Sequence, residues 1–293
     1  MTPDQASPGI LSLAPRSFIS LQGPDAQRFL NGQLTNDIRV VSESRCIYAA
    51  VLNAKGQLDA VCHVRMVDDR YLLDAPAELG EALVTRLDRY LIADQVELSP
   101  VTDTWHLAHL VGMHPDELQP ELPDTTRIAS VNRLGVDGHD LLSPAPLDLA
   151  VPVLTPDQAE ALRIGHGVPA WPSELAPGLL PPEAGLDATA ISYDKGCYLG
   201  QEVISRMKRA GKTNRHLVQF SVPAGTPAGS TILADQSPAG TVTSVSPSSC
   251  GEGRTKALGY RRRNTEKITT FRLATPDGRD LPGPATVLKR LTG

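Results

Sequence analysis

Residues 195–202 of the 293-residue chain read Lys195-Gly196-Cys197-Tyr198-Leu199-Gly200-Gln201-Glu202. Two glycines bracket Cys-Tyr-Leu, and glycine allows backbone angles and close approaches that other residues do not. The residues from Gln201 to Ala210 have a helical pattern, so the free N–H groups and the positive dipole end of that helix would lie near the cysteine. Lys195 adds a nearby cation. Both effects favour the thiolate form of Cys197.

Local chemistry leaves two interpretations of this cysteine. Cys197 is either a functional thiol or a small apolar residue packed under the start of the helix, with a solvated basic face beside it. The cluster of basic residues that follows consists of Arg206, Lys208, Arg209, Lys212 and Arg215. Of the other cysteines, Cys46 and Cys62 lie in apolar, strand-like runs and Cys250 lies in a polar loop. With no CxxC pair, the pattern indicates reduced thiols rather than a disulfide scaffold.

Composition limits the partners that we expect. The formal net charge is −5, so the overall field does not attract nucleic acid, and we expect no direct nucleic-acid binding. No apolar run is long enough to span a bilayer, so no membrane contact is expected. The stretch from Met1 to Leu13 lacks a basic start and is interrupted by prolines, which is not typical of a signal peptide. These features predict a cytoplasmic protein.

The pattern of strands and helices predicts an α+β fold. Strands are predicted at residues 17–21, 47–52, 58–67, 71–74, 96–98 and 104–111, with a hairpin over 127–142. Helices are predicted to begin near Pro24, near Ala77 with leucines up to Leu91 on one face, at Thr155 and at Gln201. Thr155 and Gln158 have the spacing of a capping box. Residues 167–187 contain five prolines and no clear period, and such long irregular segments are often functional.

The composition changes near His216. Short strands separated by Pro and Gly turns are predicted at residues 216–222, 231–234, 240–245, 256–260, 268–273 and 286–291. This pattern is typical of a small β-barrel or sandwich of roughly 80 residues. We therefore expect a bipartite α+β region over residues 1–213, made of two interleaved subdomains, and a C-terminal β-barrel over residues 214–293.

The cysteine segment resembles the Lys-Gly-Cys-Tyr-x-Gly-Gln-Glu signature of the YgfZ family of folate-binding proteins. This family includes bacterial iron–sulfur and tRNA-modification maintenance factors and mitochondrial relatives, and it is distantly related to the aminomethyltransferases (T-proteins) of the glycine cleavage system. Further blocks resemble the family in the same order, at residues 23–37, 52–57, 161–167, 180–187, 239–244 and 257–262. The blocks cover most of the chain.

The resemblance implies a T-protein-like fold, with mixed-sheet subdomains around a central opening that holds tetrahydrofolate, plus a small C-terminal β-barrel. It implies that Cys197 is the functional thiol at the opening, with Lys195 beside it in the catalytic group. The expected cofactor-binding residues are Asn36 and Asp37 of the Thr35-Asn36-Asp37 turn, Asp59, Arg163, Tyr198, Gln201 and Glu202. Tyr198 would stack on a flat ring or fill the core. An ion pair with Arg206, four residues later on the same helix face, would also explain the presence of a glutamate at position 202. No metal ligands are expected.

Two departures from the aminomethyltransferases bear on the activity. Those enzymes resemble one another in a Gly-Glu-x-Gly turn whose acid contacts the pterin, and the matching turn here is Gly135-Val136-Asp137-Gly138. They also have an Asp-Asp pair where this chain has Asp59-Ala60. A transferase needs a carboxylate to assist loss of the amine. The departures therefore favour the YgfZ-like branch.

Three functions remain as hypotheses. The first is a tetrahydrofolate-binding accessory protein that supports iron–sulfur cluster assembly or repair and the tRNA-modifying enzymes that depend on it. Cys197 would then act by sulfur exchange, redox chemistry or cluster contact, and iron–sulfur proteins would be partners. The second is a folate-dependent aminomethyl or one-carbon transferase with Asp59 as its carboxylate. The third is a folate reservoir or scaffold without chemistry. In the first, the basic cluster would attract the glutamate tail of the folate or an acidic partner.

Overall fold

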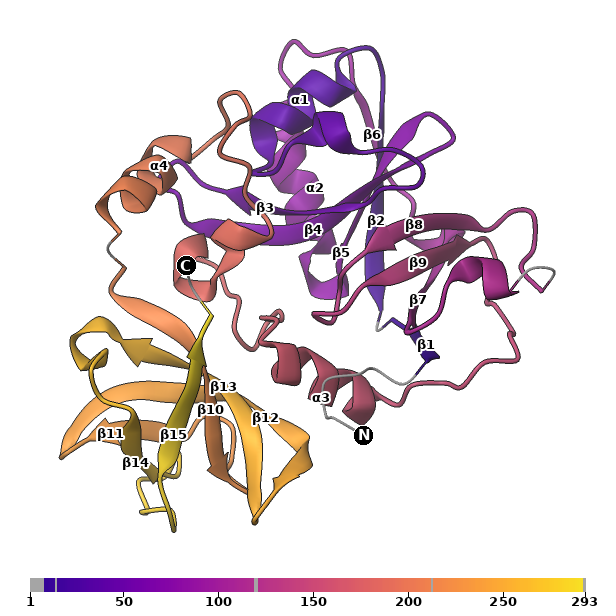
Figure 1. The fold of residues 1–293 in the computed structure, drawn as a ribbon. Coiled ribbons are helices and arrows are strands. Elements are labelled where there is room, and N and C mark those ends of the chain that lie inside the picture. Colours follow the sequence, from indigo (N-terminus) through magenta and orange to yellow (C-terminus); the bar gives the residue numbers. More distant parts are fainter. Residues whose placement is uncertain (1–7, 14, 119–120, 212, 292–293) are drawn as a thin grey trace. The chain divides into compact units, whose positions relative to one another are not determined.

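The computed structural model describes residues 8–13, 15–118, 121–211 and 213–291. The chain divides into two compact units, which are coloured along the sequence in Figure 1. The first unit contains residues 1–154 and 189–205, and the second contains residues 155–188 and 206–293. The expectations for Met1 to Ser7 and for Lys212 fall outside the described residues.

A five-stranded sheet forms the centre of the first unit, in the order β3-β4-β5-β2-β6. Its strands are β2 (Arg16–Gln22), β3 (Ile47–Leu52), β4 (Leu58–Val67), β5 (Arg70–Pro76) and β6 (Glu97–Pro100). All of its strand pairs are antiparallel, so this sheet is not the mixed sheet that we expected. The reason is the short turns that join β3, β4 and β5, since only antiparallel neighbours can be joined so tightly.

A second, four-stranded sheet in the same unit has the order β1-β7-β9-β8 and is also antiparallel. Its strands are β1 (Gly9–Ser12), β7 (His106–Val111), β8 (Arg127–Val131) and β9 (Gly138–Ser143). The predicted hairpin over residues 127–142 is therefore confirmed. Buried apolar side chains of both sheets form one cluster, made of Phe18, Val67, Leu72, Leu107 and Leu142.

Two α-helices of the first unit accompany the five-stranded sheet, α1 (Ala26–Gln33) and α2 (Gly80–Asp88). Helix α2 packs against β2 and β6, with Leu83 and Leu87 fully buried. We predicted that this helix extends to Leu91, but it ends at Asp88. The N–H of Leu91 donates to the carbonyl of Asp88, three residues earlier, and not to that of Leu87, four residues earlier, as it would in an α-helix. Leu91 therefore lies beyond the helix end.

The second unit begins with α3 (Pro156–His166). The predicted capping box is present, since the Thr155 side chain accepts from Gln158 N and the Gln158 side chain accepts from Thr155 N. Gly167 ends the helix in the left-handed conformation, with φ 81°, as a C-terminal glycine typically does. Residues 168–188 then contain only short 3₁₀ turns, among them η5 (Pro181–Ala184).

Six antiparallel strands form a closed barrel in the second unit, because β15 returns to pair with β10. They are β10 (Arg215–Pro223), β11 (Thr231–Ala234), β12 (Ser237–Gly251), β13 (Arg254–Arg262), β14 (Thr270–Ala274) and β15 (Ala285–Arg290). Closure leaves no sheet edge exposed. Phe220 and Phe271 meet edge to face in the core, with ring centres 6.3 Å apart.

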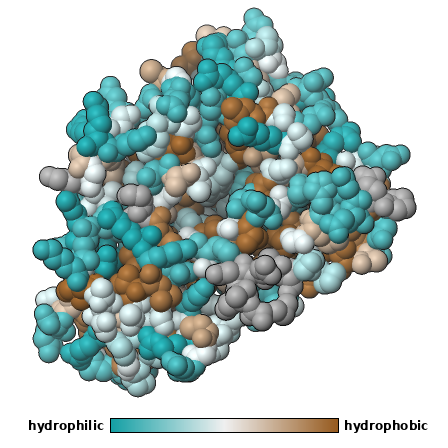
Figure 2. Space-filling view, viewed as in Figure 1, coloured by the Kyte–Doolittle hydropathy of each residue, from teal (hydrophilic) through white to brown (hydrophobic). Residues whose placement is uncertain are grey.

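Helix α4 (Gln201–Ala210) follows the cysteine segment, as predicted. Hydrophilic side chains cover much of the face seen in Figure 2, with smaller hydrophobic patches between them. Among the described residues, no helix combines the length and the apolar character needed to cross a bilayer.

Candidate functional site

The cysteine segment lies in the first unit as an irregular loop that leads into α4. Cys197 and Gly196 are exposed, whereas Lys195 and Tyr198 on either side are buried. A turn leads into the helix, because the N–H of Gln201, the first residue of α4, donates to the Tyr198 carbonyl over 3.2 Å. The interpretation of Cys197 as a packed apolar residue is therefore wrong, because its side chain faces solvent.

The ammonium group of Lys195 is enclosed by three backbone carbonyls. Its Nζ donates to the carbonyls of Asn31, Leu34 and Asn36 over 2.6, 2.7 and 2.8 Å. Burial lowers the pKa of Lys195 to about 8, although Asp37 acts in the opposite direction. An ammonium has three N–H donors, so the three carbonyls use all of them. Lys195 thus ties the cysteine loop to the end of α1.

Thr35 provides a second attachment for the loop. Its fully buried hydroxyl donates to the Ala190 carbonyl over 2.6 Å and accepts from Ala50 N on β3 over 2.9 Å. The Thr35 carbonyl accepts from Ser192 N over 3.0 Å. The hydroxyl is therefore used as both donor and acceptor, and it joins the loop to the five-stranded sheet.

The two predicted ligand residues of this turn are engaged within the protein. Asn36 donates from Nδ2 to the Tyr48 carbonyl over 2.8 Å and accepts from Asp37 N over 2.9 Å. The Asp37 carboxylate accepts from the guanidinium of Arg39 over 2.9 and 2.7 Å. This hydrogen bonding holds the pKa of Asp37 below its ordinary value. Both side chains thus shape the turn.

Glycines allow the loop and the β3–β4 turn to touch. Gly200 has φ 84°, and a Cβ there would lie 2.7 Å from the Asn53 carbonyl oxygen. Gly56 has φ 71°, and a Cβ there would lie 2.8 Å from the Val203 side chain of α4. Gly196 has neither a positive φ nor a neighbour within 4 Å of such a Cβ, so the expected need for glycine holds at Gly200 alone.

Asp59 lies beside this turn and is paired with Arg86 of α2. Arg86 Nε lies 3.3 Å from the carboxylate, and its Nη groups donate to the Gln33 side chain over 3.1 Å and to the Leu52 carbonyl over 2.9 Å. The Asp59 side chain stays 33% exposed, so it remains open to a ligand. Sequence reasoning missed Arg86, because a basic residue in the last turn of a helix does not identify its partner.

The remaining predicted residues of the motif have different environments. Tyr198 is 7% exposed and its ring centre lies 5.2 Å from the Nζ atom of Lys195, so the ring packs inside the protein. Gln201 is half-buried and Glu202 is exposed in the first turn of α4. The ion pairs of the described residues include none between Glu202 and Arg206. Gln201 and Glu202 therefore keep accessible polar groups.

Arg163 belongs to the second unit and is fully hydrogen-bonded there. Its Nε and Nη2 groups form a fork on the Glu160 carboxylate, with Nε at 2.6 Å. Nη1 donates to the Val168 carbonyl over 3.1 Å and to Glu174 over 3.0 Å, and Nη2 donates to Ser244 over 2.8 Å. These bonds use all five N–H donors, so Arg163 joins α3 to the barrel strand β12.

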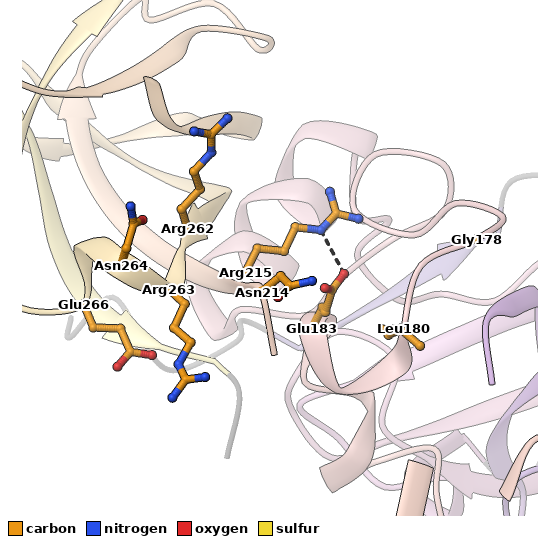
Figure 3. Close-up of a pocket in the computed structure, with 9 residues that line it drawn as sticks. All are labelled: Gly178, Leu180, Glu183, Asn214, Arg215, Arg262, Arg263, Asn264 and Glu266. Carbon is orange, nitrogen blue, oxygen red and sulfur yellow. Dashed lines mark hydrogen bonds and ion pairs between the residues drawn. The ribbon is translucent and has the colours of Figure 1, made fainter. Parts of the chain in front are cut away.

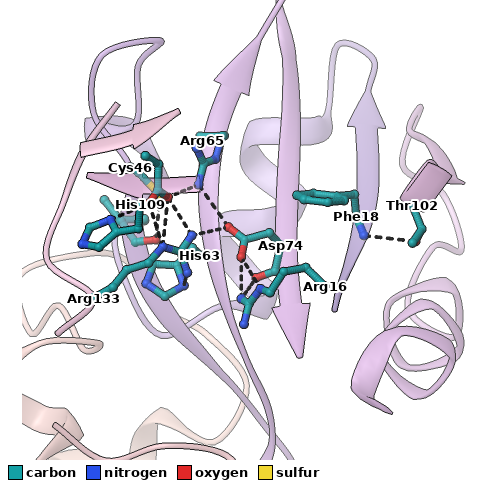
Figure 4. Close-up of polar contacts among 11 residues, drawn as sticks. Arg16, Phe18, Cys46, His63, Arg65, Asp74, Thr102, His109 and Arg133 are labelled. Atoms are coloured by element: carbon teal, nitrogen blue, oxygen red, sulfur yellow. Dashed lines mark hydrogen bonds and ion pairs between the residues drawn. The ribbon is translucent and has the colours of Figure 1, made fainter. Parts of the chain in front are cut away.

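A buried polar network, which sequence reasoning missed, lies between the two sheets of the first unit (Figure 4). We call it the arginine–aspartate network, and it consists of Arg16, Arg65, Arg133, Asp74 and Asp140. Arg133 Nη2 lies 2.8 Å from Asp74 and 2.7 Å from Asp140, and Arg65 contacts the same two carboxylates. His109 Nδ1 lies 2.9 Å from the Asp140 carboxylate.

The network keeps its carboxylates ionised. Burial alone would raise the pKa values of Asp74 and Asp140, but Arg133 and the other arginines outweigh burial and lower both. Burial, with Arg133 next to it, lowers the pKa of His63 well below its ordinary value. Three arginines thus face two carboxylates. The signal in the sequence was the pair of charged residues, Arg65 and Asp74, inside largely buried strands.

Comparison with known proteins gives three consistent results. Residues 7–128 match the domain family described as "GCVT N-terminal domain". The chain is 26% identical over 227 residues to a "tRNA-modifying protein YgfZ" from Colwellia psychrerythraea, an alignment that covers 71% of this chain and 70% of that protein. It is 28% identical over 233 residues to an "Iron-sulfur cluster assembly factor IBA57 homolog, mitochondrial" from Phaeosphaeria nodorum, covering 74% of this chain but only 56% of that protein.

A solved structure shares the fold. The glycine cleavage system aminomethyltransferase T from Bartonella henselae superposes with a TM-score of 0.77, covering 98% of this chain and 86% of that chain at 18% identity. This similarity confirms the predicted T-protein-like α+β fold. The domain match and the two relatives confirm the resemblance found in the sequence, which is to the YgfZ-type family and, more distantly, to the glycine cleavage T-proteins.

Proposed function

We propose that this chain is a tetrahydrofolate-binding accessory protein that supports iron–sulfur cluster assembly or repair, and through it the tRNA-modifying enzymes that need such clusters. Cys197 is its functional thiol. The observation that carries the proposal is an exposed Cys197 on a loop fixed by the enclosed ammonium of Lys195. The names of the relatives, a tRNA-modifying protein and iron–sulfur cluster assembly factors, support the same role.

A fixed loop gives the thiol a defined position. The bonds of Lys195 and Thr35 and the close approach at Gly200 order the backbone on both sides of Cys197. Ordering these groups in advance lowers the entropy cost of forming a contact with a partner. A thiolate is the form that binds metals and attacks sulfur. The loop is therefore suited to present a sulfur ligand or nucleophile to an iron–sulfur protein.

Tetrahydrofolate offers N–H donors on its pterin and carboxylates on its tail. Asp59 retains exposed carboxylate surface and would accept pterin N–H groups, while Gln201 and Glu202 of the cysteine motif offer accessible polar atoms. Asn36 and Tyr198 are engaged internally and would act by shaping the site. The cofactor, when bound, supplies one-carbon or redox chemistry that the chain lacks. The residues of the first unit thus fit a folate ligand.

The aminomethyltransferase alternative is less well supported by the site. Arg86 already occupies one oxygen of Asp59, and Ala60, which stands in place of a second acid, is buried at 3% exposure. A transferase would therefore have a single carboxylate tied to a cation. We infer instead a cytoplasmic accessory protein whose partners are a folate and iron–sulfur proteins, without direct contact to nucleic acid or membrane.

The thiol is tested by comparing Cys197→Ala with Cys250→Ala, since both cysteines are exposed. We expect both variants to bind tetrahydrofolate like wild type in calorimetry. In cells that lack the wild-type gene, only Cys250→Ala should restore the activity of iron–sulfur enzymes. Full restoration by Cys197→Ala would refute the role of the thiol and favour a scaffold. Absence of binding heat with tetrahydrofolate and folinic acid would refute the folate part.

The transferase alternative has its own assay. Purified protein is mixed with tetrahydrofolate and an aminomethyl-loaded lipoyl carrier, and methylenetetrahydrofolate is measured. We expect none above the background. Production that disappears in Asp59→Asn would overturn the accessory role in favour of a transferase.

A further inference from the structure

The second unit contains a pocket that the proposed function does not use (Figure 3). Its volume is about 870 Å³, which is large enough for a small-molecule ligand. Side chains from the end of β13, the start of β10 and η5 line it. Three of them are arginines, Arg215, Arg262 and Arg263, and two are acids, Glu183 and Glu266.

Arg215 is held rigidly at the wall of this pocket. Its Nε donates to the Glu183 carboxylate over 2.9 Å, and its guanidinium lies 4.6 Å from the ring centre of Tyr260. Glu183 is 5% exposed and lies on η5, and the Tyr260 hydroxyl is fixed by the Glu174 carbonyl over 2.8 Å. The bonds described for Arg215 use Nε only, so both Nη groups keep their donors for a ligand.

The pairing of β10 with β13 sets two cations against each other. Arg215 and Arg262 are directly opposite residues in the antiparallel register, so their side chains leave the same face of the pair. Figure 3 shows both side chains extending from these neighbouring strands. Like charges in this arrangement destabilise a strand pair. Arg263, the next residue, adds a third cation at the rim.

Of the three pocket arginines, Arg215 alone has an acidic partner among the described ion pairs. Glu183 is committed to Arg215. Glu266 accepts from His216 Nε2 over 2.8 Å and lies 3.5 Å from Arg290, and these partners outweigh burial and lower its pKa. Each acid therefore has a cation of its own, and Arg262 is left without an acidic partner among the described ion pairs. The pocket carries a local positive field in a chain whose net charge is −5.

We propose that this pocket binds a small polyanion, whose phosphate or carboxylate oxygens lie between Arg215 and Arg262. An oxyanion there would accept from two guanidinium groups and remove the repulsion between them. The side-chain amides of Asn214 and Asn264 line the same pocket and would contact further oxygens. Because the contacts are charged and the pocket is open, binding should weaken as salt is raised.

The test titrates the full chain by calorimetry with two probes, tripolyphosphate and triglutamate, at low and at high salt. We expect at least one probe to bind at low salt. Arg262→Ala should weaken that binding about tenfold or more, since it removes a charge-assisted fork. Arg262→Lys should give an intermediate loss, because it keeps the charge without the fork. The probe that binds identifies phosphate or carboxylate as the ligand chemistry.

Lys267→Ala is the matched control, because it removes one exposed positive charge outside the pocket lining. It should bind the probe like wild type. A second measurement is the melting temperature. Without probe, Arg262→Ala should melt at the same temperature as wild type or higher, since the substitution relieves repulsion. The probe should raise the melting temperature of wild type and of Lys267→Ala, and should raise that of Arg262→Ala less. The proposal is overturned if neither probe binds or if both variants behave alike. Cys197→Ala should bind the probe normally, so this result is independent of the proposed function.

Discussion

Lys195 and Cys197 lie two residues apart, yet their environments are opposite. Lys195 is 6% exposed with its ammonium on three carbonyls, while the Cys197 side chain faces solvent. We expected both to belong to the catalytic group. The geometry fits a positioning role for Lys195, because an ammonium with no free donor has little left for a ligand. In the proposed function the chemistry would then fall to Cys197.

Replacing Lys195 by Met tests this positioning role. The variant leaves the carbonyls of Asn31, Leu34 and Asn36 without their donor, and unsatisfied buried groups are costly. We expect a loss of about 2–4 kcal/mol in the free energy of unfolding, measured by urea denaturation. The control is Lys55→Met in the exposed β3–β4 turn, which should change stability by less than about 0.5 kcal/mol. Equal effects of the two substitutions would rule out the positioning role.

The four cysteines should differ in reactivity. Cys46 and Cys62 are buried, and burial raises the pKa of Cys46 to about 12 and that of Cys62 further. Cys197 and Cys250 are exposed. Iodoacetamide near neutral pH should therefore alkylate Cys197 and Cys250 in the native protein, and all four cysteines after unfolding, as read by peptide mass spectrometry. Rapid native labelling of Cys62 would contradict this structure of β4.

At the scale of elements, the site depends on a contact between the cysteine loop and the β3–β4 turn. Both partners are glycines with positive φ, Gly200 in the loop and Gly56 in the turn. Neither element alone requires this contact. The contact is possible because glycine has no Cβ. The carbonyl of Asn53 and the side chain of Val203 lie in the space that Cβ atoms on Gly200 and Gly56 would fill.

Alanine at the two glycines of the motif should have unequal effects. Gly200→Ala forces a side chain into the left-handed region and against a backbone oxygen, so we expect a loss of about 1–3 kcal/mol. Gly196→Ala meets no neighbour and should be within about 0.5 kcal/mol of wild type. Thermal and chemical denaturation measure both. A Gly196→Ala variant as unstable as Gly200→Ala would show that the loop has a different conformation.

At the scale of the whole molecule, the two sheets of the first unit are joined by charge as well as by apolar packing. The arginine–aspartate network lies beside the apolar cluster that contains Phe18 and Leu142. Removing one partner of a buried ion pair is far more costly than the net value of the pair, because it leaves a charge uncompensated. The network therefore makes the relative placement of these sheets sensitive to single substitutions.

Asp140→Asn should lower stability and change its dependence on pH. The folded-state pKa of Asp140 lies well below its ordinary value, so its stabilisation is complete above about pH 4 and is lost as the pH falls further. We expect a loss of about 3–5 kcal/mol near pH 7 and a shallower decline of stability between about pH 5 and pH 2. Guanidinium denaturation across this range measures both.

The control for Asp140→Asn is Asp277→Asn. Asp277 pairs with Arg279 in a turn where both side chains are mostly exposed, at 59% and 79%. A surface pair of this kind contributes little to stability. The free energy of unfolding of Asp277→Asn should therefore depend on pH as that of wild type does. If Asp140→Asn also followed the wild-type dependence, the stabilising role of the network would be contradicted.

The sequence by itself determined the elements of this protein. The strands β3, β4 and β11 begin and end at the predicted residues, and the capping box of α3 forms as its spacing predicts. Such features depend on residues within a few positions of one another, because hydrophobic periodicity, turn residues and caps act locally. The motif and its companion blocks also showed the resemblance to the YgfZ-type family before any coordinates.

Only the tertiary structure decided which polar groups meet. Lys195 binds the Asn31 carbonyl from 164 positions away, and Arg65 meets Asp140 across 75 positions. Nothing in the local pattern of a lysine or an arginine specifies a partner at such distances. A buried donor takes whichever acceptor the packed elements bring within about 3 Å, because leaving it unpaired would be costly. The roles of Lys195, Arg86 and Arg163 therefore followed from packing, while the exposure of Cys197 followed from the loop that packing fixed.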